Sequence, residues 1–275
     1  MKIDAHQHFW SYNPGEYGWI GPSAQVLRRD FLPVDLQRVT ASANIQGVVS
    51  VQARQNLEET NWLLELAHWH AWIRGVVGWL PLTAPDAAAH IATAAAHPKL
   101  KAVRHVLQDE SDDHYLLRED FNHGIRLLGR HNLAYDLLIF ERHLPQTITF
   151  VDQHPNQIFV LDHLAKPRIK ERIQEPWRKL ITDLAARPNV YCKLSGIITE
   201  ADHQHWTPAD LHPYLQTALN AFGPRRLMFG SDWPVCLLAG DYLRWTRTVE
   251  DFIAPLAPAE RNRIMGETAI EAYRL

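Results

Sequence analysis

Short apolar runs alternate with longer amphipathic segments along the chain. The apolar runs are residues 1–8, 45–52, 73–80, 100–107, 133–140, 158–165, 189–196 and 226–233. Between them, segments such as 56–72, 118–131 and 176–188 carry apolar residues three or four positions apart. This period predicts amphipathic helices, whereas the short apolar runs predict strands that are buried on both faces.

The alternation of predicted strands and helices indicates a parallel sheet covered by helices. Eight such units fit a single closed (β/α)8 TIM barrel, a fold that typically takes about 250 residues. A doubly wound open sheet is the alternative, but no predicted strand is followed by a glycine-rich phosphate-binding loop. We therefore predict one α/β barrel domain over residues 1–275.

Polar side chains gather at the carboxyl ends of the predicted strands, where active sites of such barrels lie. A charged group or an imidazole at the end of an apolar strand is costly to bury unless it is paired or used. The residues at these ends are His6, His8, Gln52, Trp79, Arg104, His105, Asp136, Asp162, His163, Lys193 and Asp232. In a closed barrel they would converge on one polar pocket.

The stretch "DAHQH" places two histidines one residue apart in the first predicted strand. Residues i and i+2 of a strand point to the same side, so His6 and His8 would face one point, as a metal or a reacting carbonyl requires. The alternative is a pair of solvated side chains near the terminus. By the same geometry, Arg104 and His105 should leave their strand on opposite faces unless a bulge admits both.

Composition narrows the classes of partner. Charged residues make up 21% of the chain and the net charge is -3, which offers no basic field for nucleic acid. No apolar run reaches the ~18 residues of a membrane span. Cys192 and Cys236 cannot form a disulfide framework, so we expect a cytoplasmic protein. We also expect it to act on a small molecule, as either a monomer or a homodimer.

The strand-end residues favour attack by water, because they include no candidate serine or cysteine nucleophile beside a base. Asp232, in "FGSDWP", is the candidate base, although a turn or helix-capping aspartate would fit the same letters. His163 can polarise a carbonyl, bind a metal or bond to backbone. Lys193 can stabilise an oxyanion or form a structural ion pair.

Other strand-end residues are candidates for holding the substrate. Arg104 suits a carboxylate or a polyol oxygen, and aromatic rings can pack on a sugar ring or a flat lactone. The predicted substrate-binding residues are Gln52, Arg104, His105, Trp10 and Trp79.

The motifs "DAHQHFW", "GWL", "VRHVLQDE", "LDHLAKP", "YCKLSG" and "FGSDWPV" together resemble the amidohydrolase superfamily. Within it they are similar to the branch of sugar lactonases such as L-fuconolactonase and L-rhamnono-lactonase, to which 2-pyrone-4,6-dicarboxylate lactonase is related. The resemblance spans Lys2 to about Leu275. It implies an amidohydrolase-like (β/α)8 barrel whose site contains His6, His8, His163 and Asp232.

The resemblance also implies chemistry. Metal-binding members use a further histidine at the fifth strand, where this sequence offers Asp136 in "LAYDLLIF". His6, His8 and Asp232 would hold one divalent ion, expected to be zinc, with no organic cofactor. The implied reaction is hydrolysis of a sugar acid lactone of the L-fuconolactone type by water attack on the ester carbonyl.

Two other functions stay open. A 2-pyrone-4,6-dicarboxylate-type lactonase or an aromatic acid decarboxylase would belong to the same superfamily. The pyrone substrate is a dianion that would need more than one arginine, and Arg104 is the one arginine at a strand end. A non-catalytic sugar-binding barrel is the second alternative.

Two segments are candidates for covering the pocket, residues 29–36 and 196–206. The second is an acid- and histidine-rich loop in which Glu200, Asp202 and Trp206 either reach the substrate or stay solvated.

Overall fold

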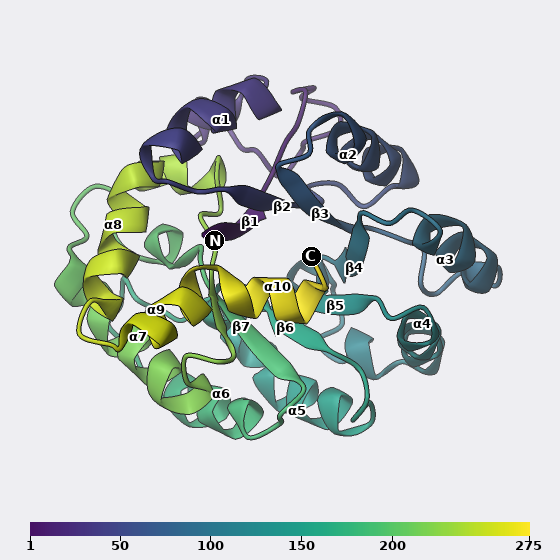
Figure 1. Cartoon of the computed structure of the whole chain (residues 1–275). Helices are drawn as coiled ribbons and strands as arrows, with labels where there is room; N and C mark the ends of the chain where they lie inside the picture. The colour runs from purple at the N-terminus through teal and green to yellow at the C-terminus, as the bar shows by residue number, and fades with distance from the viewer.

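The computed structural model describes residues 1–275 as a ring of eight parallel strands (Figure 1). The strands are β1 (Ile3–Gln7), β2 (Gly47–Val51), β3 (Ile73–Gly78), β4 (Leu100–His105), β5 (Ala134–Leu137), β6 (Phe159–Leu161), β7 (Val190–Leu194) and β8 (Leu227–Phe229). Each strand pairs with the next in chain order, and a parallel bridge from Gln7 to Trp233 joins the first strand to the segment after the last. The predicted (β/α)8 barrel is confirmed.

Helices cover the outside of the ring (Figure 1). These are α1 (Pro33–Ser42), α2 (Leu57–Trp69), α3 (Ala87–Ala95), α4 (Glu119–Arg130), α5 (Leu144–Asp152), α6 (Trp177–Ala185), α7 (Pro208–Phe222) and α8 (Tyr242–Ile253), and they are followed along the chain by α9 (Pro258–Asn262) and α10 (Thr268–Tyr273). Asn56 and Asp241 begin α2 and α8 because their side chains accept hydrogen bonds from backbone N–H groups of the first turn. None of these helices has the length and apolarity to cross a membrane.

Several strands are shorter than the apolar runs that predicted them. The run 158–165 contains only Phe159–Leu161 as strand, because the chain turns into a left-handed conformation from His163 onward. The run 226–233 likewise leaves the sheet after Phe229, and Asp232 has a positive φ of 56°. Both departures bring a candidate site residue to the mouth of the barrel.

The barrel interior is layered. Its lower layer is apolar and includes Ala102, Ala134, Val160 and Tyr191 from four neighbouring strands. Two residues further along each strand, the inward side chain is charged, as the period of two dictates. These four residues are Arg104, Asp136, Asp162 and Lys193, and all are buried. Apolar packing therefore supports a charged layer directly below the mouth.

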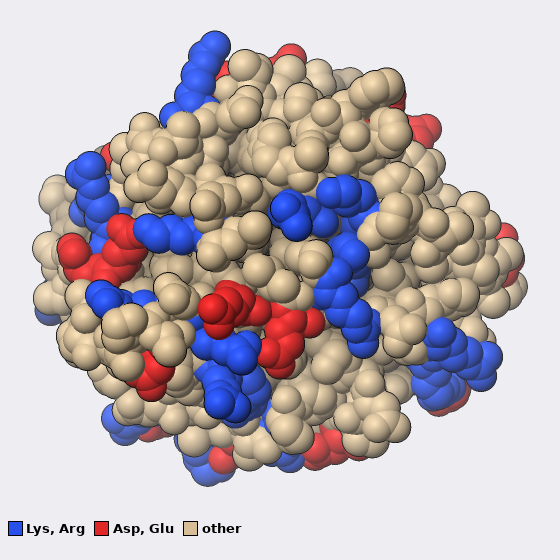
Figure 2. Space-filling view, viewed as in Figure 1, with Lys and Arg blue, Asp and Glu red and all other residues tan.

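The C-terminal helix α10 lies across the end of the barrel where the strands begin (Figure 1). Its Ala269, Ala272 and Tyr273 pack into the apolar lower layer. Figure 2 shows this same end, with a run of Lys and Arg beside the C-terminus, where Lys101 Nζ donates to the carbonyl of Arg274 at 2.9 Å. Because this end is plugged, the polar pocket opens only at the opposite end.

Candidate active site

His6, His8 and Asp232 converge at the mouth of the barrel. The two Nε2 atoms of His6 and His8 are 3.1 Å apart. Asp232 Oδ1 lies 3.4 Å from Nε2 of His8 and 3.6 Å from Nε2 of His6. The backbone N–H of Asp232 donates to the carbonyl of His6 at 2.8 Å, which ties the end of β8 to β1. The strand geometry predicted from "DAHQH" therefore brings both imidazoles to one carboxylate.

This trio fits a divalent ion. Two atoms that each lie about 2.0 to 2.1 Å from a tetrahedral zinc ion are separated by roughly 3.3 Å, close to the separations found here. His8 Nδ1 lies 2.8 Å from the carbonyl of Val51, which can only accept, so the proton sits on Nδ1 and the Nε2 lone pair faces the trio. Such a bond from the second ring nitrogen is typical of a metal-binding histidine.

His6 has two neighbours at its other ring nitrogen. Nδ1 lies 3.3 Å from Asp162 Oδ1 and 3.1 Å from Lys193 Nζ. If Lys193 donates a hydrogen bond to Nδ1, the ring proton of His6 must sit on Nε2. If Nδ1 instead carries the proton and donates to Asp162, Nε2 is free to bind a metal. Lys193 Nζ already lies 2.9 Å from the buried Asp162 Oδ1, so donation from His6 Nδ1 would give this oxygen a second partner. With that donation, the surroundings of both histidines suit a metal.

Burial sets the protonation of the site. It lowers the pKa of His6 well below its usual value and that of His163 to about 4, so both rings are neutral at pH 7. Burial alone would raise the pKa of Asp232, but the surrounding imidazoles, His163 foremost, hold it below its usual range. An ionised carboxylate thus faces the neutral rings of His6 and His163.

His163 is held from the side opposite Asp232. Its Nδ1 lies 2.8 Å from Ser195 Oγ, and its Nε2 lies 4.0 Å from Asp232 Oδ1. Gly196 follows Ser195 with a φ of +65°, and a Cβ there would come within 2.3 Å of His163 Nδ1. Only glycine combines that backbone conformation with so close an approach to the ring.

A left-handed turn carries His163 into the pocket. His163, Leu164, Ala165 and Lys166 have φ values of 53°, 55°, 59° and 51°, a conformation that costs roughly 1–2 kcal/mol per L-residue. Trp177 Nε1 holds the turn by donating to the carbonyl of Leu164 at 2.7 Å. A strained run of this kind is typical of functional sites and is maintained by the structure around it.

The charged layer beneath the trio is a closed network. Lys193 Nζ lies 2.6 Å from Asp136 Oδ2 and 2.9 Å from Asp162 Oδ1. Arg104 Nη1 donates to Asp162 Oδ2 at 2.8 Å, and the Tyr273 hydroxyl lies 2.8 Å from Asp136 Oδ2. Two cations therefore balance two carboxylates within the barrel.

The position of Lys193 differs from its predicted role at an oxyanion. Its side chain is fully buried below His6, and both of its carboxylate partners belong to the network rather than to the pocket. The structure thus places Lys193 where it orients His6 and fixes the charge beneath it, not where it meets a carbonyl.

A cavity of about 480 Å³ opens above the trio. Gln52 and Arg104 line it as predicted, and Arg104 is held by Gln52 through contacts of 2.5 Å to its carbonyl and 2.7 Å to Oε1. The residues around the cavity are His8, Glu16, Gly18, Trp19, Gln52, Ala53, Arg54, Gln55, Asn56, Arg104, Val106, Gln108, Asp109, Leu138, His163, Lys166, Asp232 and Val235. Arg54 and Lys166 were not singled out from the sequence, because they lie on loops with no strand end to mark them.

Three predicted substrate-binding residues lie outside this cavity. Trp10 is buried, with Nε1 donating to the carbonyl of Arg29 at 2.9 Å. Trp79 and His105 line a separate cavity of about 180 Å³, and His105 Nε2 lies 2.6 Å from Glu110. His105 follows inward-facing Arg104 on the same strand, so the opposite faces expected for this pair are realised and no bulge turns His105 inward.

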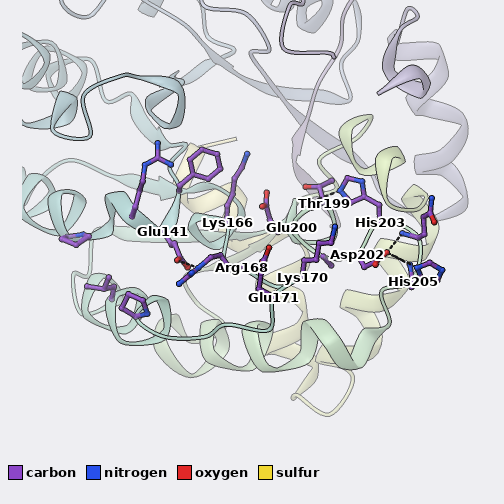
Figure 3. A pocket seen from close by; sticks show the side chains of 17 residues that line it. Glu141, Lys166, Arg168, Lys170, Glu171, Thr199, Glu200, Asp202, His203 and His205 are labelled. Atoms are coloured by element: carbon purple, nitrogen blue, oxygen red, sulfur yellow. Dashed lines mark hydrogen bonds and ion pairs between the residues drawn. The ribbon is translucent and has the colours of Figure 1, made fainter. Parts of the chain in front are cut away.

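A larger cavity of about 1010 Å³ lies among the loops that follow β5, β6 and β7 (Figure 3). Glu200 and Asp202 line it, rather than the cavity above the trio. Trp206 is buried, and its Nε1 donates to the carbonyl of Ala239 at 2.5 Å. Lys166 is common to both cavities.

This chain is similar in sequence to a known protein family and to two proteins of known activity. The family model described as amidohydrolase matches residues 3–275. The chain belongs to the amidohydrolase family. This amidohydrolase is 42% identical to an L-fucono-1,5-lactonase of Burkholderia multivorans, covering 100% of this chain and 96% of the relative. An L-fucono-1,5-lactonase of Burkholderia ambifaria is 38% identical, with the same shares covered.

A solved structure adds a metal to the comparison. The crystal structure of an amidohydrolase from Burkholderia multivorans with bound zinc superimposes on this amidohydrolase with a TM-score of 0.95, at 42% identity, over 100% of this chain and 99% of that one. Together with the trio of His6, His8 and Asp232, the zinc in that structure supports a divalent metal here.

Proposed function

We propose that this protein hydrolyses the lactone of a sugar acid, with L-fuconolactone as the type of substrate. The observation that carries the proposal is the convergence of Asp232 with His6, His8 and His163 at the floor of a cavity of about 480 Å³. Full-length similarity to L-fucono-1,5-lactonases supports the substrate class.

The side chains supply a balanced route to ring opening. Asp232 takes a proton from water as the water oxygen bonds to the ester carbonyl carbon. The carbon–oxygen bond of the ring then breaks, and Asp232 returns the proton to the leaving ring oxygen. The product is an open hydroxy acid, which releases a proton at neutral pH.

His163 is suited to polarise the carbonyl. If the Ser195 hydroxyl donates to Nδ1 across 2.8 Å, the neutral ring carries its proton on Nε2. That N–H is then free to donate to the carbonyl oxygen, where negative charge develops. In that arrangement Ser195 selects the tautomer that can polarise the carbonyl.

His6, His8 and Asp232 would hold a divalent ion, with zinc preferred. When bound, the ion supplies a more acidic water and a Lewis acid for the carbonyl. The chain's own contribution is to hold both Nε2 lone pairs toward one point, through the bond from His8 to Val51 and the contact of His6 with Asp162.

The charges around the cavity favour an uncharged, hydroxyl-rich substrate. Arg104 is paired with Asp162, and Arg54 is paired with Glu16 and Glu59, so neither arginine is free for a carboxylate. The amide side chains on the wall are Gln52, Gln55, Asn56 and Gln108. Amides donate to and accept from hydroxyl groups, as a sugar lactone requires.

The proposal includes the cellular compartment, the partner and the oligomeric state of the protein. Cys192 and Cys236 are both free and buried, which agrees with a reducing cytoplasm. We propose a small-molecule sugar lactone as its partner and a monomeric or homodimeric enzyme.

Hydrolysis of a panel of lactones tests the function. Proton release from L-fucono- and L-rhamnono-lactone is expected to be faster than the uncatalysed rate by at least about 10⁶-fold, the lower end of enzymatic acceleration. The same assay with 2-pyrone-4,6-dicarboxylate, and carbon dioxide release from dihydroxybenzoates, serve as comparisons. Turnover of only the aromatic acids would replace the proposal, and lactone binding without turnover would indicate a sugar-binding barrel.

Chelation tests the metal. Dialysis against a chelator is expected to lower turnover at least roughly 10-fold, and one equivalent of zinc or manganese should restore it, because the ion supplies the acidic water. Metal content of the purified protein is measured in parallel. The variant His8→Ala should lose the ion, whereas His90→Ala, altered on the outer helix α3, should keep it. Full turnover with no ion bound would contradict the proposed metal site, but it would leave the proposed roles of Asp232 and His163 unchanged.

A further inference from the structure

Lys166 is the free cation of the active-site cavity. Three side chains with permanent positive charge line that cavity, Arg54, Arg104 and Lys166. Both arginines are bound by carboxylates, whereas Lys166 takes part in none of the ion pairs and lies over the Phe140 ring at 5.3 Å. A flexible ammonium without a fixed partner is available to a ligand.

The left-handed turn aims Lys166 at the reaction site. The N–H of Lys166 donates to the carbonyl of His163 at 2.8 Å, a three-residue spacing. With three residues per turn, side chains at i and i+3 lie above one another in either hand of helix. His163 and Lys166 therefore face the same side and both line the cavity, while Leu164 and Ala165 between them are buried in the core.

The surroundings of Lys166 agree with this placement. Its charge opposes the burial that raises the pKa of Glu200, and Figure 3 shows Lys166 and Glu200 as neighbours that extend in the same direction. Lys166 thus lies beside Glu200 on the border of the two cavities that it lines.

We infer that Lys166 is a catalytic residue whose ammonium contacts the carbonyl oxygen of the lactone and holds the carboxylate formed from it. This inference rests on the proposed function. Ring opening turns a neutral ester into an anion, so the oxygen beside His163 gains charge through the reaction. A free ammonium there binds the charged form more tightly than the neutral one, which is the differential binding that accelerates a reaction.

The test compares Lys166→Met with Lys170→Met. Lys170 lines only the larger cavity, so its replacement removes the same charge from the same loop without touching the active-site cavity. Lys166→Met is expected to lower kcat/KM for L-fuconolactone by roughly 10- to 100-fold, the effect of losing a hydrogen bond to a charged group. Lys170→Met should stay within about twofold of the parent, and Lys166→Arg should recover part of the loss.

Binding of L-fuconate, the open acid, gives a readout that a structural role would not move. Titration calorimetry should show that Lys166→Met weakens the binding of L-fuconate at least about tenfold. The variant should unfold at the same temperature as the parent. Unchanged kcat/KM and unchanged L-fuconate affinity in Lys166→Met would overturn the inference. Failure of the proposed function is distinct, because the parent protein itself would then not open L-fuconolactone.

Discussion

The variant Asp232→Asn is expected to lose about 10²- to 10⁴-fold in kcat for a sugar lactone, the range typical of removing a general base. The amide keeps the size of the carboxylate but cannot take a proton from water, and it removes the negative charge that faces His6 and His8. Steady-state proton release measures the loss.

A control variant tests whether the loss of a carboxylate outside the active-site cavity has the same effect. Asp202→Asn removes a carboxylate from the loop after β7, which lies outside the active-site cavity, and should keep kcat within about twofold. Circular dichroism of both variants should match that of the parent, since Asp232 makes no contact with the charged network. Near-normal turnover by Asp232→Asn would remove Asp232 from its assigned role.

The second large effect concerns stability. Lys193→Met is expected to lower the free energy of unfolding by about 3–5 kcal/mol, because Asp136 and Asp162 would keep buried negative charge without their ammonium. Activity should fall with it, because His6 loses a neighbour 3.1 Å from Nδ1. Urea unfolding followed by tryptophan fluorescence measures the change.

Two further variants test the reason for that loss. Adding Asp136→Asn to Lys193→Met removes one stranded charge and should recover part of the stability, a coupling that independent sites would not show. Lys179→Met breaks an exposed pair with Asp183 on α6 and should cost less than about 1 kcal/mol. An unfolding midpoint for Lys193→Met equal to that of Lys179→Met would refute the buried network as a source of stability.

The barrel could be predicted because its signals are local and repeated. Each apolar run and each amphipathic segment carries its own period, and errors at one boundary do not spread to the next. The main misses lie where tertiary structure overrides the apolar pattern, as in the run 158–165, where the strand ends at Leu161 and a left-handed turn follows. Of the four residues in "HLAK", histidine alone is enriched at positive φ, so packing determines the conformation of the other three.

The site was partly predictable for the same reason. His6, His8, His163 and Asp232 stand at strand ends, and the structure brings them together. Depth along the barrel axis is invisible in the sequence, so Lys193 looked like a mouth residue although it belongs to the layer below. Trp79 and His105 also stand at a strand end, but their side chains leave the barrel for a cavity of their own.

The plug formed by α10 has a consequence for folding. Asp136 reaches its hydroxyl partner only when α10 has docked and Tyr273 lies in the lower layer of the barrel. The hydrogen-bond network beneath His6 is thus completed by a helix far along the chain from β1. A variant without α10 would carry every residue of the mouth and still lack part of the environment beneath His6.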